Sequence, residues 1–562
     1  MLRIIYLLLI LVCIFPTVPG TVGVLLSSLS YVPPIGMTSI SLEGFIAVFE
    51  WSAVWKSIAL TIFTTLFSCL LCCFLAFSII QSTWRYRRWR IVERALSPLL
   101  AMPHVAFAIG FAFLFSPTGI ISRLINPVID VSSIALLVKD QYGLGLSFAL
   151  ALKELPFLLL MSVPILNQLK IDQLAKVTTS LGYSPNQFWW KCVFPQWLTK
   201  IRFPLIAIVA YSASVVDISL ILGPTNPPTF SVLVWQWFSN PDLHLFPRAG
   251  AGAVLLFFIC SLLFLLVRTF EWFCVSKRKQ WQYSGRYGFS VPGQRFFIML
   301  MLINLTILPL TIVWSFAQRW RFPDLIPSKF SRQFWALEWE SILPTINNSL
   351  LLALISSGVA LLFALVAHEY QNKYRLHIPH FIIALPILVP QLSLLFGIQV
   401  ATLYINFNSY FIWVVWSHVF FAFPYVFLAL DGPWKSYEEG YTRTALSLGK
   451  SPLYTWLKIK APILLPAILF SWAIGASVSL AQYLPTLMLG AGRISTITTE
   501  AVALSSGFDR RVTAIYAIWQ AALPFLFFTF AYMTSRIQSR VINKRRRKII
   551  DHEPFSKKTH HL

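Results

Sequence analysis

Runs of about 20 apolar residues recur along the whole 562-residue chain. A helix of that length is needed to cross the roughly 30 Å hydrocarbon core of a bilayer. Each run has to be helical, because lipid offers the backbone no hydrogen-bond partner. With 57% hydrophobic and only 12% charged residues, the chain does not fit a soluble globular domain. The sequence predicts an all-α polytopic membrane protein.

We expect about twelve spans, six in each half of the chain. The first run follows Arg3 and lacks a small-residue cleavage site, which favours an uncleaved anchor over a signal peptide. The expected spans are 4–26, 57–80, 98–115, 144–166, 205–223, 251–270, 296–317, 349–368, 382–403, 411–430, 463–490 and 512–532.

The formal net charge of +24 comes from Lys and Arg in short loops and in the tail. Basic loops remain on the cytoplasmic side of a membrane, so this pattern does not indicate a nucleic-acid-binding surface. It predicts both termini in the cytoplasm. The clusters are Arg85, Arg87, Arg88, Arg90 and Arg94; Lys277, Arg278, Lys279 and Arg286; and Lys544, Arg545, Arg546, Arg547 and Lys548.

A polar 16-residue segment occurs twice, as SLGYSPNQFWWKCVFP at 180–195 and SLGKSPLYTWLKIKAP at 447–462, with eight identical positions. The surrounding polar segments, 171–197 and 431–462, are called here the first and second repeat loops. A repeat of this period indicates two copies of one folding unit. Two like halves place a transport path most naturally at their interface.

The duplication divides the chain into four parts. We expect a first half at 1–275, a basic cytoplasmic linker at 276–294, a second half at 295–540 and a basic cytoplasmic tail at 541–562. Pro103 and Gly110 recur at the same spacing as Pro390 and Gly397, which supports this division.

Each repeat loop carries the signals of a helix, a tight turn and a second helix. Gly182 and Gly449 can adopt positive φ and end a helix. Ser184-Pro185 and Ser451-Pro452 fit a helix cap followed by proline in the first turn. Such a rigid protrusion suits insertion into a groove on a partner, whereas the simpler alternative is an ordinary loop with two turns.

The repeat loops resemble the EAA loop of ABC importer permease subunits, written E-A-A-x-x-L-G with a closing I-x-L-P. Leu181-Gly182 and Leu448-Gly449 match its Leu-Gly, Pro195 and Pro462 match its closing proline, and Asp172 fits an acidic residue often found ahead of it. Nearly the whole chain resembles the fused permeases of iron(III)- and thiamine-type uptake systems.

The resemblance implies the type I ABC importer permease fold in a bacterial inner (plasma) membrane. In that family the loops couple the permease to two copies of a separate cytoplasmic ABC ATPase. A periplasmic or extracellular solute-binding protein delivers a small solute. The resemblance leaves the solute open among iron(III), thiamine, a polyamine, an oxyanion and others.

The chain departs from the family where the motif has Glu-Ala-Ala. Lys176-Val177-Thr178 and Arg443-Thr444-Ala445 stand there, so both acidic positions are basic. A reversed charge facing an unchanged partner would lower affinity, and we therefore expect a dedicated ATPase.

No catalytic, cofactor or metal site is predicted in this chain. Gly449-Lys450-Ser451 looks like part of a phosphate-binding loop, but such a loop needs a glycine where Thr444 stands and a preceding strand. The partner would therefore use the ATP. Cys69, Cys72 and Cys73 have no nearby His or acidic residue to complete a zinc site.

Charged residues within a span usually face an interior path. Asp217, Glu154 and His418 are the candidates for a translocation path. As alternatives, Lys153 could neutralise Glu154 and His418 could be a packing residue, whereas Asp217 has no evident local partner.

Two alternative functions are a secondary transporter and a membrane enzyme. A twelve-helix secondary transporter driven by an ion gradient would also have two halves, but it gives no reason for matched loops after the fourth and tenth spans. A membrane enzyme acting on lipid-linked substrates would need acidic or His clusters at the membrane edge, and none is convincing.

Overall fold

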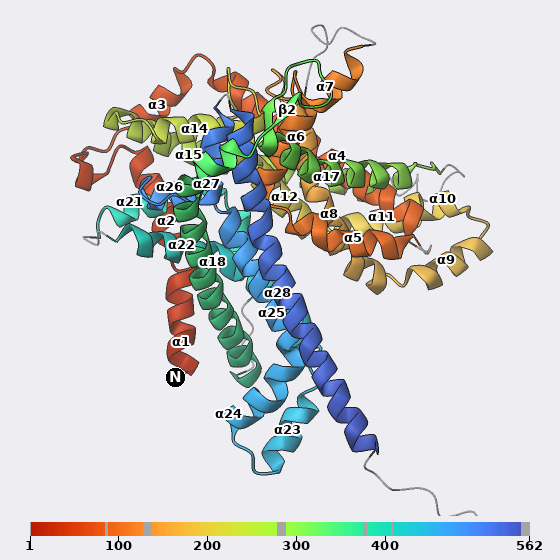
Figure 1. Cartoon of the computed structure of the whole chain (residues 1–562). Coiled ribbons are helices and arrows are strands. Elements are labelled where there is room, and N and C mark those ends of the chain that lie inside the picture. Colours follow the sequence, from red (N-terminus) through yellow and green to blue (C-terminus); the bar gives the residue numbers. More distant parts are fainter. Residues whose placement is uncertain are drawn as a thin grey trace, which may run out of the picture.

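The computed structural model describes residues 2–84, 88–127, 137–277, 288–374, 379–405, 409–507 and 509–551 (Figure 1). Arg85, Arg87, linker residues 278–287 and tail residues 552–562 lie outside the described part of the chain. The described residues are mostly helical.

The first half is built around three long helices, α4 (Val54–Thr83), α8 (Leu144–Gln168) and α15 (Phe246–Trp272). Helix α4 packs against both α8 and α12, and α12 packs against α15. The shorter helices are α3 (Glu43–Phe49), α5 (Trp89–Ala101), α6 (His104–Phe115), α7 (Ile120–Ile125), α9 (Ile171–Ser180), α10 (Pro185–Gln187), α11 (Phe194–Lys200), α12 (Arg202–Ser214), α13 (Asp217–Leu222) and α14 (Phe230–Phe238).

The second half is a bundle of four long helices, α18 (Gln333–Tyr374), α22 (Tyr410–Lys435), α25 (Ala461–Ala481) and α28 (Arg510–Asp551). A small antiparallel ribbon pairs β1 (Ala317–Arg319) with β2 (Lys329–Phe330) in the loop before α18. The other helices are α17 (Gly293–Phe316), α19 (His380–Ile383), α20 (Leu385–Leu388), α21 (Gln391–Thr402), α23 (Glu439–Ser447), α24 (Pro452–Thr455), α26 (Leu484–Leu489) and α27 (Ile497–Ser505).

Ten helices in the described part of the chain are long and apolar enough to cross a membrane. An eleventh crossing is added if the pair Pro185–Lys200 and Arg202–Ser214, bent by 62°, counts as one span. The count is therefore ten or eleven where the sequence predicted about twelve. The difference lies at two places. The expected span 205–223 is divided between α12 and α13 and counts only through the bent pair. At 382–403, Pro386 and Pro390 divide the expected span into the short helices α19, α20 and α21.

The two halves break their helices at equivalent prolines. Helix α5 ends at Met102, in an extended conformation before Pro103, and α6 begins at once. Helix α20 ends in the same way at Val389, before Pro390 and α21. A residue that precedes proline is disfavoured in the helical conformation, so each break follows from the sequence and adds to the evidence for duplication.

The first helices of the two halves are exchanged. The N-terminal segment, with α1 (Leu2–Leu9) and α2 (Thr17–Ser28), packs against α18 and α21 of the second half, and α17 packs against α4 and α6 of the first half. Each also keeps a contact with its own half, α2 with α15 and α17 with α28. These contacts need glycine, because a Cβ on Gly110 would overlap the side chain of Ile307. A Cβ on Gly397 would overlap the backbone of Gly20.

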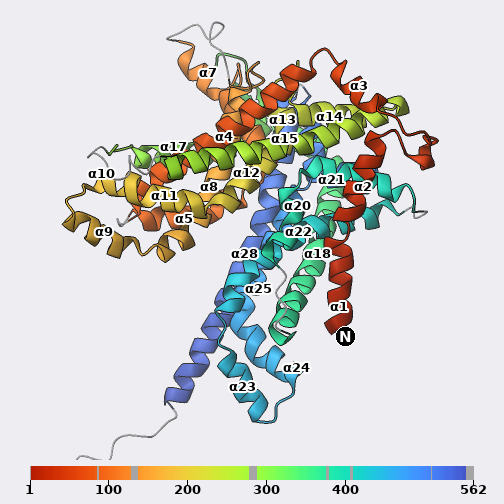
Figure 2. The ribbon, with the colours of Figure 1, turned by 180° about the vertical axis from the view of Figure 1, so that it is seen from behind.

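The halves are joined at one end and diverge at the other. Figure 1 shows α7 and β2 at the joined end, and Figures 1 and 2 show α9–α10 and α23–α24 at the tips of two separate arms. At the joined end, the guanidinium of Arg123 donates to Thr118 O at 3.1 Å and to Arg321 O at 2.7 Å. Arg510 from α28 donates to Ser116 Oγ at 3.2 Å. Residues of both halves therefore hold this end together.

Candidate functional site

The first repeat loop is a helical hairpin with a glycine at its turn. Helix α9 ends before Gly182, which has φ +80°. The side chain of Ser184 accepts a hydrogen bond from Gln187 N, and Ser184 N donates to Gln187 Oε1 at 2.8 Å. This reciprocal cap starts α10, with Pro185 at its first position. The predicted helix, turn and second helix are confirmed.

The second repeat loop repeats this geometry. Gly449 follows α23 with φ +75°. Ser451 Oγ accepts from Tyr454 N at 3.2 Å and starts α24, again with Pro452 at its first position. Gly449-Lys450-Ser451 thus follows a helix and not a strand, unlike the setting of a phosphate-binding loop.

The tips of the repeat loops expose apolar side chains. Leu181 is 69% exposed and Leu448, at the equivalent position, is 72% exposed. Both glycines have open space around them. The basic side chains of Lys176 and Arg443 are exposed on the same hairpins. Paired apolar tips with adjacent positive charge are the features expected of a surface that enters a groove on another protein.

Each repeat loop is anchored to its arm by buried groups. In the second loop, the ammonium of Lys460 lies 2.9 Å from Glu369 of α18, 3.5 Å from Glu439 of α23 and 4.5 Å from the ring centroid of Trp434. In the first loop, Pro195 is buried. There the ring of Phe77 from α4 packs against Trp189, Trp190, Phe194 and Trp197. The two hairpins are thereby connected to the long helices α18 and α4. Pro462, unlike Pro195, is only partly buried.

Lys153 and Glu154 do not neutralise each other through a direct ion pair. Lys153 Nζ donates to Met102 O at 2.6 Å and to Leu99 O at 3.3 Å, which satisfies carbonyls left free where α5 ends. Glu154 Oε1 instead lies 3.2 Å from His104 Nε2, at the start of α6. Glu154 is therefore held at the first Pro break.

Asp217 opens α13 at a second pair of equivalent breaks. Helices α12 and α25 end at Ser214 and Ala481, and the residues that follow, Val215 and Gln482, are extended. Asp217 is partly exposed. Its carboxylate interacts electrostatically with His104, Tyr211 and Tyr483. Two of the three candidate path residues, Glu154 and Asp217, thus share one neighbourhood.

His418 occupies a different environment. It is 1% exposed. Its Nδ1 lies 2.8 Å from Ser479 Oγ, and its Nε2 lies 2.9 Å from Thr486 Oγ1. A buried histidine with both ring nitrogens hydrogen-bonded favours the packing role that the sequence left open.

Four side chains near Glu154 and Asp217 were not singled out from the sequence. The rings of His104 and Tyr211 are tilted relative to each other, with centroids 5.0 Å apart. Tyr425 of α22 interacts electrostatically with both Glu154 and Tyr211. Tyrosine in a membrane protein is usually read as an interfacial residue. The signal that could have found Tyr425 is its place after Pro424, in the middle of a span. We call His104, Glu154, Tyr211, Asp217, Tyr425 and Tyr483 the interface cluster.

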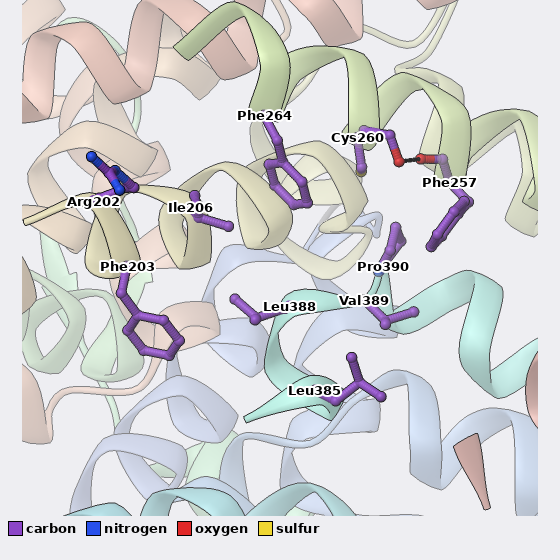
Figure 3. A pocket seen from close by; sticks show the side chains of 11 residues that line it. Arg202, Phe203, Ile206, Phe257, Cys260, Phe264, Leu385, Leu388, Val389 and Pro390 are labelled. Atoms are coloured by element: carbon purple, nitrogen blue, oxygen red, sulfur yellow. Dashed lines mark hydrogen bonds between the residues drawn. The ribbon is translucent and has the colours of Figure 1, made fainter. Parts of the chain in front are cut away.

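An apolar pocket of about 470 Å³ lies between α12, α15 and α20 (Figure 3). Phe203, Phe264 and Leu388 contribute to its walls. Arg202 at its edge pairs with Glu271 at 2.7 Å. The pocket adds apolar surface between the halves.

Comparison with known proteins identifies relatives of the chain. It is 31% identical over 474 residues to the inner membrane ABC transporter permease protein YnjC of Escherichia coli (strain K12), covering 82% of this chain and 84% of that protein. A spermidine/putrescine transport system permease protein PotC homolog of Mycoplasma genitalium is 24% identical and covers 41% of this chain and 85% of its own length. A second PotC homolog, from Mycoplasma pneumoniae, is 25% identical over 30% of this chain. No protein-family profile matches.

The helical architecture with exchanged first helices, apolar spans and paired loops is that of a multi-pass membrane protein. The chain belongs to the inner membrane ABC transporter permease proteins. It is a transport subunit rather than an enzyme.

Proposed function

We propose that this chain is the fused permease of an ATP-driven importer, with its path between the two halves. The two repeat loops dock on two copies of a cytoplasmic ABC ATPase, which binds and hydrolyses the ATP, and a solute-binding protein delivers the solute from outside. In this arrangement both termini are cytoplasmic. The relatives named as spermidine/putrescine permeases are consistent with a small solute.

The observation that carries the proposal is the matched pair of hairpins. Leu181 and Leu448 are exposed to nearly the same degree. Leu181 follows α9 and Leu448 follows the equivalent helix α23, and each leucine precedes a glycine with positive φ. An isolated exposed leucine needs no explanation, but two at equivalent tips of two arms indicate a repeated contact. Two ATPase copies supply two such contacts.

Lys176 and Arg443 set the charge that the partner must match. Both are exposed beside the apolar tips, so each ATPase copy should present acidic side chains around its groove. Replacing both by Glu should weaken co-purification of the ATPase strongly, because like charges would then face each other.

The test is affinity purification of the tagged chain from native membranes, with Gly182→Val and Gly449→Val combined in one variant. Valine at positive φ costs about 1–2 kcal/mol at each turn and should displace both tips, so the ATPase should be lost from the purified complex. Gly440→Ala, in α23 and with ordinary contacts around its new Cβ, is the matched control and should retain the ATPase.

A secondary transporter makes the opposite prediction. Wild-type protein that purifies without an ATPase and accumulates solute in liposomes on an ion gradient alone would refute the importer proposal.

A further inference from the structure

We propose that the apolar pocket between α12, α15 and α20 binds one acyl chain of an anionic phospholipid, and that the phosphate of its headgroup binds Arg202 and Arg268. The inference goes beyond the importer proposal, because it concerns the surrounding membrane and not the solute, the solute-binding protein or the ATPase. It rests on the pocket and on the ion pairs at one end of it (Figure 3).

Both halves of the protein form the pocket. Ile206 of α12 and Phe264 of α15 come from the first half, and Leu388 of α20 comes from the second. Among the lining side chains, Phe203 is 41% exposed and Phe257 is 43% exposed, so the pocket is open at its rim. A molecule bound there would contact both halves at once.

The surface around the opening has the composition of a surface in contact with lipid. Further side chains of α15 near the pocket are large, apolar and between 40% and 62% exposed, namely Phe258, Leu262, Leu265 and Leu266. They lie in the middle of a helical segment that is long and apolar enough to cross a membrane. At that depth the surrounding solvent is hydrocarbon, so the pocket opens toward acyl chains.

The inside of the pocket offers apolar contacts along its length. Ser261 Oγ donates to Phe257 O at 2.9 Å, and Cys260 is 1% exposed, so neither polar side chain requires a partner from a ligand. Lipid is as apolar as these walls, and an acyl chain therefore gains close packing there and not transfer out of water. Selectivity among lipids must come from the charged end of the pocket.

Arg202 brings a charged group to that end. Its Nη2 lies 2.7 Å from Glu271 Oε1, and its Nε donates to Glu271 Oε2 at 3.0 Å. Arg268 Nη1 lies 2.7 Å from Glu271 Oε2. In the described part of the chain, Glu271 is the only acidic side chain within ion-pair distance of either guanidinium. Two arginines and one carboxylate leave a net positive charge beside the pocket.

The two guanidiniums are also accessible to a headgroup. The side chains of Arg202 and Arg268 are 42% and 51% exposed, whereas that of Glu271 is 6% exposed. The buried carboxylate fixes both guanidiniums, and the fork of N–H donors on arginine matches the oxygens of a phosphate. Basic pockets between membrane helices bind anionic headgroups. A lipid with net negative charge therefore fits this end.

One face of α15 carries both the apolar and the charged part of the site. The side chains involved recur every three or four residues, at Phe257, Ser261, Phe264, Arg268 and Glu271, and so lie on one side of the helix. Phe257 and Arg268 are eleven residues apart, which corresponds to about 16 Å at 1.5 Å per residue. This is about half of the roughly 30 Å hydrocarbon core, the depth of one leaflet.

The residue after Glu271 supports this depth. Trp272 is 50% exposed, and tryptophan is enriched where hydrocarbon meets the headgroups. The charged end of the pocket thus lies at headgroup level, and Phe257 lies near the middle of the membrane.

Native mass spectrometry of the detergent-purified full-length chain tests the headgroup contact. Phosphatidylglycerol and phosphatidylcholine with the same acyl chains are added at equal concentrations. Both carry a phosphate, but only phosphatidylglycerol has a net negative charge, so it should be retained preferentially.

Arg202→Gln should weaken binding of phosphatidylglycerol about tenfold, the usual effect of losing a charge-assisted contact. Arg268 still pairs with Glu271 in this variant, so the carboxylate is not left alone. Arg202→Lys keeps the charge and should bind more tightly than Arg202→Gln. Arg295→Gln, an exposed arginine in the first turn of α17 outside the pocket, is the matched control and should bind like wild type.

Ser261→Trp fills the pocket and leaves both arginines in place. It should also weaken binding about tenfold, because the acyl chain is excluded. Leu262→Trp adds the same side chain at the next residue of α15, which is exposed but does not line the pocket, and should have no effect. Phosphatidylglycerol should raise the melting temperature of wild type and Leu262→Trp more than that of Ser261→Trp, since a ligand stabilises the state that binds it.

Photocrosslinking locates the bound lipid. Phosphatidylglycerol with a photoreactive group at the end of one acyl chain should label peptides that contain 257–264 or 385–390. Labelling confined to other segments would overturn the inference, as would equal retention of the two lipids by the wild-type protein. Wild-type affinity in Arg202→Gln or Ser261→Trp, with a normal size-exclusion profile, would do the same. If either variant does not fold, the lipid preference of the wild type and the labelled peptides decide.

Discussion

At the scale of single residues, neighbouring charges in this protein have separate tasks. Lys153 and Glu154 are adjacent in sequence, yet Lys153 satisfies the carbonyls freed at Met102 and Leu99, and Glu154 turns to His104. Burying a carbonyl without a donor costs about 1–3 kcal/mol. The lysine therefore stabilises the helix break itself and leaves the glutamate to interact with His104.

Glycine at the exchange of the first helices gives a stability prediction. Gly397→Ala should lower the unfolding free energy by about 1–3 kcal/mol, the usual cost of overpacking, because its Cβ would overlap backbone atoms of Gly20 that cannot rotate away. Thermal denaturation of the detergent-solubilised chain measures the loss.

The control for this prediction is Gly358→Ala in α18, where a Cβ meets open space. It should be neutral or slightly stabilising, since alanine has the higher helix propensity. Equal melting temperatures for Gly397→Ala and wild type would show that α2 and α21 are not in close contact.

At the scale of elements, each repeat loop combines an exposed tip with an anchored base. In the second loop the base is Lys460, which joins α18 to α23 through Glu369 and Glu439 and is itself buried. Breaking an ion pair by removing one partner is more costly when the pair is shielded from water. The hairpin can therefore move with α18 as a unit instead of flexing on its own.

Lys460→Met should loosen this base while leaving the tip sequence intact. Both of its partners are partly exposed, so we expect a modest local loss of about 1 kcal/mol. Limited digestion with chymotrypsin should then cleave faster at Tyr441 and Tyr454. The exposed Lys458→Met in the same loop is the matched control; equal cleavage in the two variants would contradict the anchoring role.

At the scale of the whole molecule, the halves are joined at one end and open at the other. Arg123 and Arg510 hold the joined end by hydrogen bonds between α7, the ribbon loop and α28. Two rigid arms that meet at one end can rock about it. Such rocking would bring the repeat loops together and alter access to the interface cluster.

Spin labels at equivalent positions of the two hairpins measure this motion. Ser180→Cys and Ser447→Cys, in a chain whose seven native cysteines are replaced, should report a shorter distance when the ATPase partner and a non-hydrolysable ATP analogue are bound. The distance should lengthen again when nucleotide is removed. An unchanged distance in both states would contradict arm closure driven by the repeat loops.

The sequence by itself determined the helical membrane class, the duplication and the local form of the repeat loops. Apolar run length, the repeated SLG-x-SP segment and the positive-φ glycines act over short stretches of chain, so their consequences can be read locally. The break at Pro390 was readable in the same way, although its effect on the span 382–403 was missed.

Only the tertiary structure decided which distant side chains meet. Exchange of α2 and α17, the separation of Lys153 from Glu154, the burial of His418 and the approach of Tyr425 and Tyr483 to the carboxylates all depend on contacts between segments far apart in sequence. Residue pattern fixes which face of a helix is apolar, but the neighbour of that face is chosen by packing of the whole chain.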